Sequence, residues 1–236
     1  RTRQYAVRRI EFDHWLLQRA GVPVHTHTVK KIQTDRSGYV IDDRFECRYL
    51  VGAGGTHCPV RRTFAPPLPA RPETARIAAV EKEFTGRQRI RECHIWYLEQ
   101  GLPGYAWYLP KQGGWINIGI GGKQHRLASR KTTIMDHWRR FVRSLMDKGF
   151  LDQSPGNPSG HTYYLRHKSV AAGPETVFIT GDAAGLSTLD MGEGIHAAIQ
   201  SGIAAADAII SSRPMQMDHI SRFSLPGLMK AGFFRR

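Results

Sequence analysis

The residues best suited to chemistry lie near the C-terminus, where a short apolar strand expected at 176–180 leads into G-D-A-A-G at 181–185. This bend places the carboxylate of Asp182 directly after Gly181. A carboxylate there can accept a hydrogen bond from a sugar or ribitol hydroxyl, while flanking glycines let the backbone approach a ligand closely. The pattern predicts a ligand site rather than an ordinary glycine-capped turn.

A second glycine motif follows about ten residues later, at the expected start of a helix over 192–212 that is lined with Ala and Gly. The positive end of such a helix can approach a polar, electron-accepting ring. The motif consists of Gly192, Glu193, Gly194 and Ile195. Two interpretations of Glu193 stay open, because its carboxylate could contact a ligand or cap the helix.

A third glycine segment follows an apolar strand earlier in the chain, in residues 49–62. The strand runs into a turn containing Gly54 and Gly55 and then into a short helix, a geometry that brings backbone close to a phosphate or a planar ring. Cys58 and Arg61 lie in the turn and helix that follow.

Two strands of the central region carry aromatic residues and glycines at regular spacing. On an extended strand Tyr105 and Trp107 project from the same face and offer wide apolar surfaces, and Pro110 ends that strand. Gly119 and Gly121 on the next strand allow close approach. The alternative is an aromatic hairpin in an ordinary sheet core.

Taken together, G-D-A-A-G and the following G-E-G-I resemble the flavin-contacting segment of FAD-dependent oxidoreductases of the aromatic-hydroxylase-like superfamily. The resemblance implies that Asp182 binds the ribitol of FAD and that residues 192–195 point at the pyrimidine side of the ring. R-x-x-F-D-x-x-L, beginning at Arg9, is similar to a family segment whose arginine faces FAD.

Residues 52–61 resemble the second fingerprint of that superfamily, G-A-D-G-x-x-S-x-V-R, which implies FAD contacts at Gly54 and Gly55. Two departures matter: Gly54 replaces the aspartate and Cys58 replaces the serine. Because that aspartate is associated with both FAD and NADPH, its absence disfavours an NADPH-driven monooxygenase.

The aromatic segment resembles the substrate motif [Y/F]-x-W-x-F-P-x(7–8)-G-x-G of geranylgeranyl reductases, with Leu109 in place of the phenylalanine. The resemblance assigns substrate contacts to Tyr105, Trp107, Pro110, Gly119 and Gly121. It implies an FAD-dependent oxidoreductase that reduces C=C bonds of an isoprenoid-like or other apolar substrate. The alternatives are a flavin-dependent monooxygenase or halogenase, or a truncated non-catalytic relative that acts as a basic binding protein.

Composition limits the partners and the compartment. The 236 residues carry a net charge of +14, which suits an anionic cofactor, nucleic acid or an anionic membrane surface. No nucleic-acid motif accompanies the charge, so nucleic acid is disfavoured.

Three cysteines without a C-x-x-C pair indicate a reducing, cytoplasmic compartment. His25 and His27 lack an apparent third ligand, so no metal is expected.

The electron donor is expected to be a reduced nicotinamide or a donor protein, and no side chain identifies the proton donor or another catalytic group. The tail at 213–236 mixes apolar and basic residues, as a peripheral membrane contact would or a helix docking on another domain.

The elements predict an α/β fold, with an antiparallel sheet and helix inserted into a discontinuous Rossmann-like FAD-binding domain. The expected domains are 1–65 and 161–212 for FAD, 66–160 for substrate, and the tail. The family's opening strand with G-x-G-x-x-G is absent from these residues, and the sequence begins without Met. We therefore expect either that the numbering starts inside a longer protein or that the chain is a shortened relative, and that residues 1–236 alone bind FAD weakly or not at all.

Overall fold

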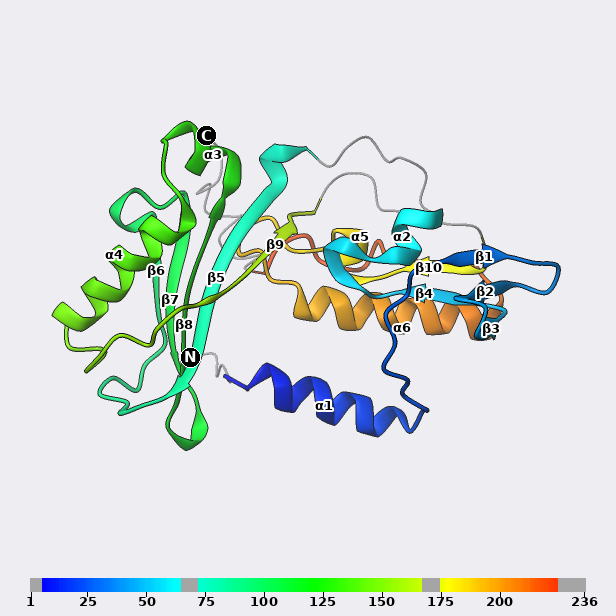
Figure 1. Ribbon diagram of the computed structural model, residues 1–236, viewed down its shortest axis with the longest axis horizontal. Helices are drawn as coiled ribbons and strands as arrows, with labels where there is room; N and C mark the ends of the chain where they lie inside the picture. The colour runs from blue at the N-terminus through cyan, green and yellow to red at the C-terminus, as the bar shows by residue number, and fades with distance from the viewer. Residues whose placement is uncertain (1–5, 65–71, 167–174, 225–236) are drawn as a thin grey trace. The chain divides into compact units, whose positions relative to one another are not determined.

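The computed structural model describes residues 6–64, 72–166 and 175–224. The chain divides into two compact units. The sheet unit comprises residues 1–26 and 77–161, and the glycine-loop unit comprises residues 27–76 and 162–236. Both helices and sheets are present, which confirms the α/β class (Figure 1). Residues 6–26 belong to the sheet unit, and the expected domain boundaries and functions stay predictions.

The sheet unit contains a five-stranded sheet in the order β6-β7-β8-β5-β9, with antiparallel pairing from β6 to β5. Its strands are β5 (Arg76–Thr85), β6 (His94–Tyr97), β7 (Gly104–Pro110), β8 (Trp115–Lys123) and β9 (Ser159–Tyr164), and β9 passes into the glycine-loop unit at residue 162. Its helices are α1 (Arg9–Ala20), α3 (Gln124–Ser129) and α4 (Ile134–Asp147). The four strands expected from residues 75 to 120 are confirmed, whereas β9 begins inside the loop expected at 154–160.

Helix α4 covers one face of this sheet (Figure 1). Its apolar stripe, including Trp138, Phe141 and Leu145, packs on the alternate isoleucines of β8. Each such side chain, when fully buried, contributes roughly 1.5–3 kcal/mol. Thr133 and Asp136 form a capping box at its start, with Asp136 N–H donating to Thr133 Oγ1 and Thr133 N–H donating to Asp136 Oδ2. The opposite face therefore carries Trp107 and the other alternate residues of β7 and β8.

The glycine-loop unit contains a three-stranded antiparallel meander and a separate parallel pair, β4 with β10. The strands are β1 (Ile32–Thr34), β2 (Tyr39–Ile41), β3 (Phe45–Cys47), β4 (Leu50–Gly52) and β10 (Val177–Ile179). The helices are α2 (Pro59–Phe64), α5 (Gly181–Ala184) and α6 (Ile195–Ser211), with a short 3-10 helix η1 (Gly55–His57). The small residues Ala205 and Ala208 of α6 pack on Phe178 of β10, so the close approach expected for this helix is confirmed.

Two strand predictions in this unit were wrong. The strand expected over 24–33 is reduced to β1, because the backbone N–H groups of Lys30 and Lys31 donate to the Asp42 carboxylate instead of to a neighbouring strand. The strand expected over 45–51 is two strands, since β3 pairs with β2 while β4 pairs with β10. Most of the linker expected at 66–72 lies outside the described residues.

Helix α1 begins four residues earlier than the expected Asp13, and none of its residues is buried. Its start is tied to the sheet by Arg8, whose guanidinium lies 3.6 Å from the ring centroid of Trp115 and donates to Glu83 at 3.1 Å. Lys111 donates to the other oxygen of Glu83 at 2.5 Å. Burial raises the pKa of Glu83, but the hydrogen bonds from Lys111 and Arg8 outweigh burial and hold the pKa below its usual value.

We predict that Glu83→Gln lowers the free energy of unfolding at neutral pH and that this difference from the wild type disappears in acid. A carboxylate with a lowered pKa in the folded state stabilises the fold above its unfolded pKa, about 4.3. The contribution is lost as the pH falls through the lower folded value. Urea unfolding at pH 7 and pH 3 measures it, and a difference that persists unchanged at pH 3 would contradict the ion-pair account.

Candidate functional site

The parallel pairing of β4 with β10 brings two glycine segments together that lie more than 120 residues apart. Ile179 is opposite Gly52, and the N–H of Thr180 donates to the carbonyl of Gly52 at 3.1 Å. Both strands end at the same edge of the pair, so η1 and α5 lie next to each other there. The carboxyl edge of parallel strands is where open α/β sheets bind ligands.

Gly181 occupies the tight turn between β10 and α5. Its φ of 54° is in the left-handed region, and an added Cβ would lie 3.1 Å from the Cβ of Ala198 in α6. Its N–H donates to the buried Ser201 hydroxyl at 2.9 Å. Glycine is therefore required for both conformation and packing at this position.

Asp182 follows in the first turn of α5, where its Oδ1 accepts a hydrogen bond from the Ser187 hydroxyl at 2.9 Å. Gly194 packs directly on this carboxylate, since a Cβ at Gly194 would lie 3.0 Å from Asp182 Oδ1. Gly192, with φ of 62°, lies under Tyr163, whose hydroxyl would be 2.5 Å from an added Cβ. The structure thus brings Asp182 together with Gly194 of the second motif, whereas Gly192 packs against Tyr163.

Glu193 caps helix α6. Its Oε1 accepts a hydrogen bond from the N–H of His196 at 2.8 Å, and its backbone exchanges bonds with Thr188. Of the two interpretations of this carboxylate, the structure shows the capping role, and contact with a cofactor stays a prediction. Ile195 begins α6 and is 38% exposed, so its side chain is available at the helix start.

The turn after β4 has an open glycine followed by a packed cysteine. Gly55 has φ of 69° and nothing within 4 Å of an added Cβ, which leaves the backbone of this turn accessible. Gly54 differs, because a Cβ there would lie 3.2 Å from the Cα of Cys58, which is 1% exposed. An aspartate at position 54, as in the fingerprint, would therefore press on this cysteine.

Arg61 in α2 was not among the residues assigned from sequence, although it is the arginine of the V-R pair. Its Nε is buried and has no hydrogen-bond partner among the described residues. A buried guanidinium donor left unpaired is costly, and a bound anionic or carbonyl group would satisfy it. The turn and the helix after it thus offer open backbone at Gly55 and an unpaired donor at Arg61, which fits a ligand that carries a hydrogen-bond acceptor.

Arg9 is not part of the glycine-loop unit. It is on α1 in the sheet unit, more than half exposed, and its guanidinium pairs with Asp13 one turn along the helix at 3.0 Å. The structure does not bring Arg9 together with the glycine segments inside one unit. Its assignment to a cofactor stays a prediction.

The aromatic motif spans the β7–β8 hairpin in direct register. Trp107 is opposite Gly119 and Tyr105 is opposite Gly121, so each aromatic side chain faces a glycine across the strands. The two rings have centroids 5.6 Å apart, and Tyr97 of β6 extends the row at 5.9 Å from Tyr105. Of the two glycines, Gly119 provides the room in which the Trp107 ring lies.

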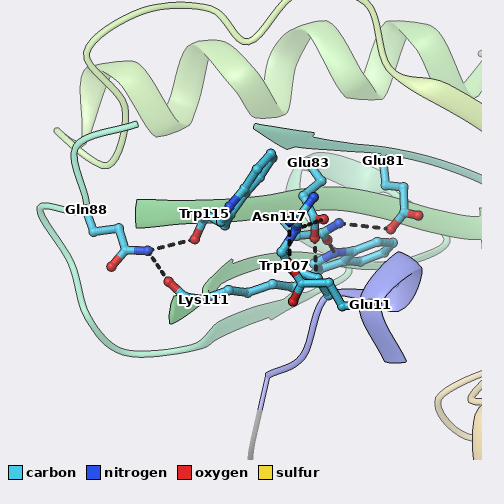
Figure 2. Close-up of polar contacts among 9 residues, drawn as sticks. Glu11, Glu81, Glu83, Gln88, Trp107, Lys111, Trp115 and Asn117 are labelled. Atoms are coloured by element: carbon cyan, nitrogen blue, oxygen red, sulfur yellow. Dashed lines mark hydrogen bonds and ion pairs between the residues drawn. The ribbon is translucent and has the colours of Figure 1, made fainter. Parts of the chain in front are cut away.

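Trp107 lies flat across the backbone of β8. An added Cβ at Gly119 would be 2.1 Å from Cζ2 of the indole, whereas one at Gly121 would keep ordinary contacts of 3.8–4.0 Å. The indole N–H donates to Asn117 Oδ1 at 2.7 Å, and Asn117 Nδ2 donates to Glu81 Oε2 at 3.3 Å (Figure 2). Asn117 and Glu81 were missed from sequence, because neither belongs to a local motif.

Nothing in the described ranges indicates a metal site or a membrane span. Among those residues no group of three or more His, Cys, Asp or Glu side chains could hold a metal ion. His27 instead lies 2.7 Å from Asp42. None of the helices there is long and apolar enough to cross a bilayer.

Comparison with known proteins finds the same fold in flavin-dependent enzymes. No protein-family model matches the chain. It is similar to an uncharacterized protein of Methanosarcina barkeri, 26% identical over 228 residues that cover 87% of this chain and 52% of the relative. The chain thus spans about half the length of that relative.

Among solved structures, the triple mutant of the flavin-dependent brominase Bmp2 superposes with a TM-score of 0.62 at 18% identity, covering 87% of this chain and 57% of that one. A flavoprotein/dehydrogenase from Cytophaga hutchinsonii gives 0.60 at 14% identity, over 97% and 61% of the two chains. A geranylgeranyl bacteriochlorophyll reductase-like protein from Thermoplasma acidophilum gives 0.49 at 24% identity, over 67% and 40%. The first two comparisons show that this chain has the fold of flavoproteins.

We predict that Gly119→Ala displaces the Trp107 indole and destabilises the sheet unit by about 1–3 kcal/mol, because the added methyl overlaps the ring. Gly121→Ala is the matched control on the same strand and face, and it should change the free energy of unfolding by less than about 1 kcal/mol. Urea unfolding and near-ultraviolet circular dichroism measure both effects. Equal behaviour of the two variants would show that the indole does not lie on Gly119.

Proposed function

We propose that this chain forms part of an FAD-dependent oxidoreductase that reduces C=C bonds of an isoprenoid-like or other apolar substrate. The observation that carries the proposal is the meeting of the glycine segments around Asp182 at the carboxyl ends of β4 and β10. The shared fold with a flavin-dependent brominase and a flavoprotein/dehydrogenase supports FAD as the cofactor. When bound, reduced FAD supplies the hydride.

In this proposal the glycine-loop unit holds the cofactor. Asp182, which accepts from the Ser187 hydroxyl, is the carboxylate that binds a ribitol hydroxyl in this proposal. Open backbone at Gly55 and the start of α6 at Gly194 and Ile195 allow close approach to the ring. The unpaired Nε of Arg61 donates to a polar group of the cofactor.

The sheet unit provides the substrate contacts. The row of Tyr97, Tyr105 and Trp107 offers apolar ring surface on the face that α4 leaves uncovered. Of the polar groups beside it, Asn117 accepts a hydrogen bond from the indole N–H and donates one to Glu81. An apolar substrate therefore meets ring surface without leaving these partners unpaired.

A halogenase or monooxygenase is the second candidate, and the fold similarity to the brominase favours it. Gly54 in place of the fingerprint aspartate argues against the NADPH-driven monooxygenase within that class. The electron donor in either case is a reduced nicotinamide or a donor protein.

Peripheral membrane contact through residues 213–236 also stays a proposal, and most of the apolar-basic segment lies outside the described residues.

We expect Asp182→Ala to reduce the flavin bound by the intact protein about tenfold or more, because a hydrogen bond to a charged acceptor is lost. Asp207→Ala, a surface aspartate of α6, is the matched control and should retain wild-type flavin. Flavin absorbance per chain, with circular dichroism as the folding check, measures the effect. Wild-type stoichiometry in folded Asp182→Ala would remove this residue from the cofactor site, and absence of flavin from the wild type would refute the FAD proposal.

The reaction class separates the two candidates. Under anaerobic conditions, we expect the reduced wild-type protein to recover oxidised-flavin absorbance when geranylgeraniol is added, and Trp107→Ala to slow this recovery. The expected reason is loss of the ring surface that holds the chain. Rapid NADPH oxidation stimulated by an aromatic substrate, with oxygen-dependent hydroxylation or halide incorporation, would instead establish the second candidate.

A further inference from the structure

The side chains beside Trp107 form a hydrogen-bonded row across three strands. The row runs from the indole N–H of Trp107 on β7 to Asn117 on β8 and then to Glu81 on β5 (Figure 2). The distances are 2.7 Å from the indole nitrogen to Asn117 Oδ1 and 3.3 Å from Asn117 Nδ2 to Glu81 Oε2. The three residues are brought together by register, since Glu81 and Trp107 both lie opposite Gly119.

The direction of donation in this row is fixed by chemistry. An indole N–H can only donate and an ionised carboxylate can only accept, so the Asn117 amide must turn its oxygen to Trp107 and its nitrogen to Glu81. Asn117 is 7% exposed, in a strand where a β-branched apolar residue would be cheaper to bury. Its presence is explained by the two partners that it joins.

Gly119 leaves space for the indole to lie on β8, but it does not fix the orientation of the ring, because glycine has no side chain that could bond to it. The hydrogen bond to Asn117 supplies that direction, since it restricts the ring to orientations in which Nε1 points along the sheet. The ring face turned away from Gly119 is then presented in one plane. Such an arrangement suits a ligand that makes extended van der Waals contact rather than hydrogen bonds.

We infer that Asn117, itself oriented by Glu81, is a positioning residue that holds the Trp107 indole flat for an apolar, chain-like ligand. The inference rests on the proposed function, because it takes Trp107 as a contact surface for an apolar substrate. It assigns roles to two polar residues that lie outside the aromatic and glycine motif.

The first experiment needs no ligand. In the protein labelled with ¹⁵N-tryptophan, the Trp107 indole N–H signal is identified by its loss in Trp107→Phe. Asn117→Leu should move this signal to the position of an indole without a protein acceptor and speed its exchange with solvent. Glu92→Gln, at an exposed carboxylate away from the row, is the control and should leave it unchanged.

The second experiment swaps the amide and the carboxylate of the row between positions 117 and 81. Asn117→Asp keeps an acceptor for the indole but places a second carboxylate beside Glu81, so the orientation should be lost. Adding Glu81→Gln restores a donor to that carboxylate, and the Trp107 signal should return toward the wild-type position. This rescue distinguishes positioning by hydrogen bonds from a requirement for side-chain bulk.

The ligand arm uses geranylgeraniol as the probe, titrated against tryptophan fluorescence. Asn117→Leu and Asn117→Asp should each weaken binding about five- to tenfold, the effect of one net hydrogen bond, and the double substitution should recover most of it. Failure of the wild type to bind the probe would refute the apolar substrate, while the indole signals would still test the row. An unchanged signal in Asn117→Leu, or a double variant no better than Asn117→Asp, would overturn the positioning role.

Discussion

The parallel pairing of β4 with β10 is the constraint on which the candidate cofactor site depends. Each strand has only three residues, yet backbone bonds continue beyond both ends, from Leu50 N–H to Thr176 and from Thr180 N–H to Gly52. The pairing closes a long segment of chain, so its entropic cost has to be met by packing. Phe178 against the alanines of α6 supplies part of that packing.

The glycines around the β4–β10 strand pair have two different structural roles. Gly181, Gly192 and Gly194 are positions where a Cβ would meet a neighbour at about 3 Å or less, and the neighbour of Gly194 is the Asp182 carboxylate itself. Gly55 is open instead, and there the absence of a side chain leaves backbone accessible. The same residue type thus allows close packing at three positions and access at another.

In the sheet unit, several charged and amide side chains have hydrogen-bond partners close to the aromatic residues. The Glu83 carboxylate accepts hydrogen bonds from Lys111 and Arg8. The Gln88 amide donates to the carbonyl oxygens of Lys111 and Trp115 (Figure 2). Paired in this way, charged and amide groups can lie beside aromatic rings without a large desolvation cost. This region is therefore mixed in composition, although the ring surface of Trp107 and Tyr105 remains its most apolar part.

The sequence alone determined the class of fold, most strands and helices of the sheet unit, and the glycine motifs, because periodicity and glycine spacing are local signals. It could not determine which residues become neighbours. The pairing of Trp107 with Gly119, the hydrogen bonds of Asn117 and Glu81, and the unpaired Nε of Arg61 follow from strand register and helix packing. The capping role of Glu193 was also decided only in three dimensions, since a carboxylate before a helix can turn either to the helix or to a ligand. Contacts between distant segments are set by the free energy of the whole fold, which no single stretch of sequence encodes.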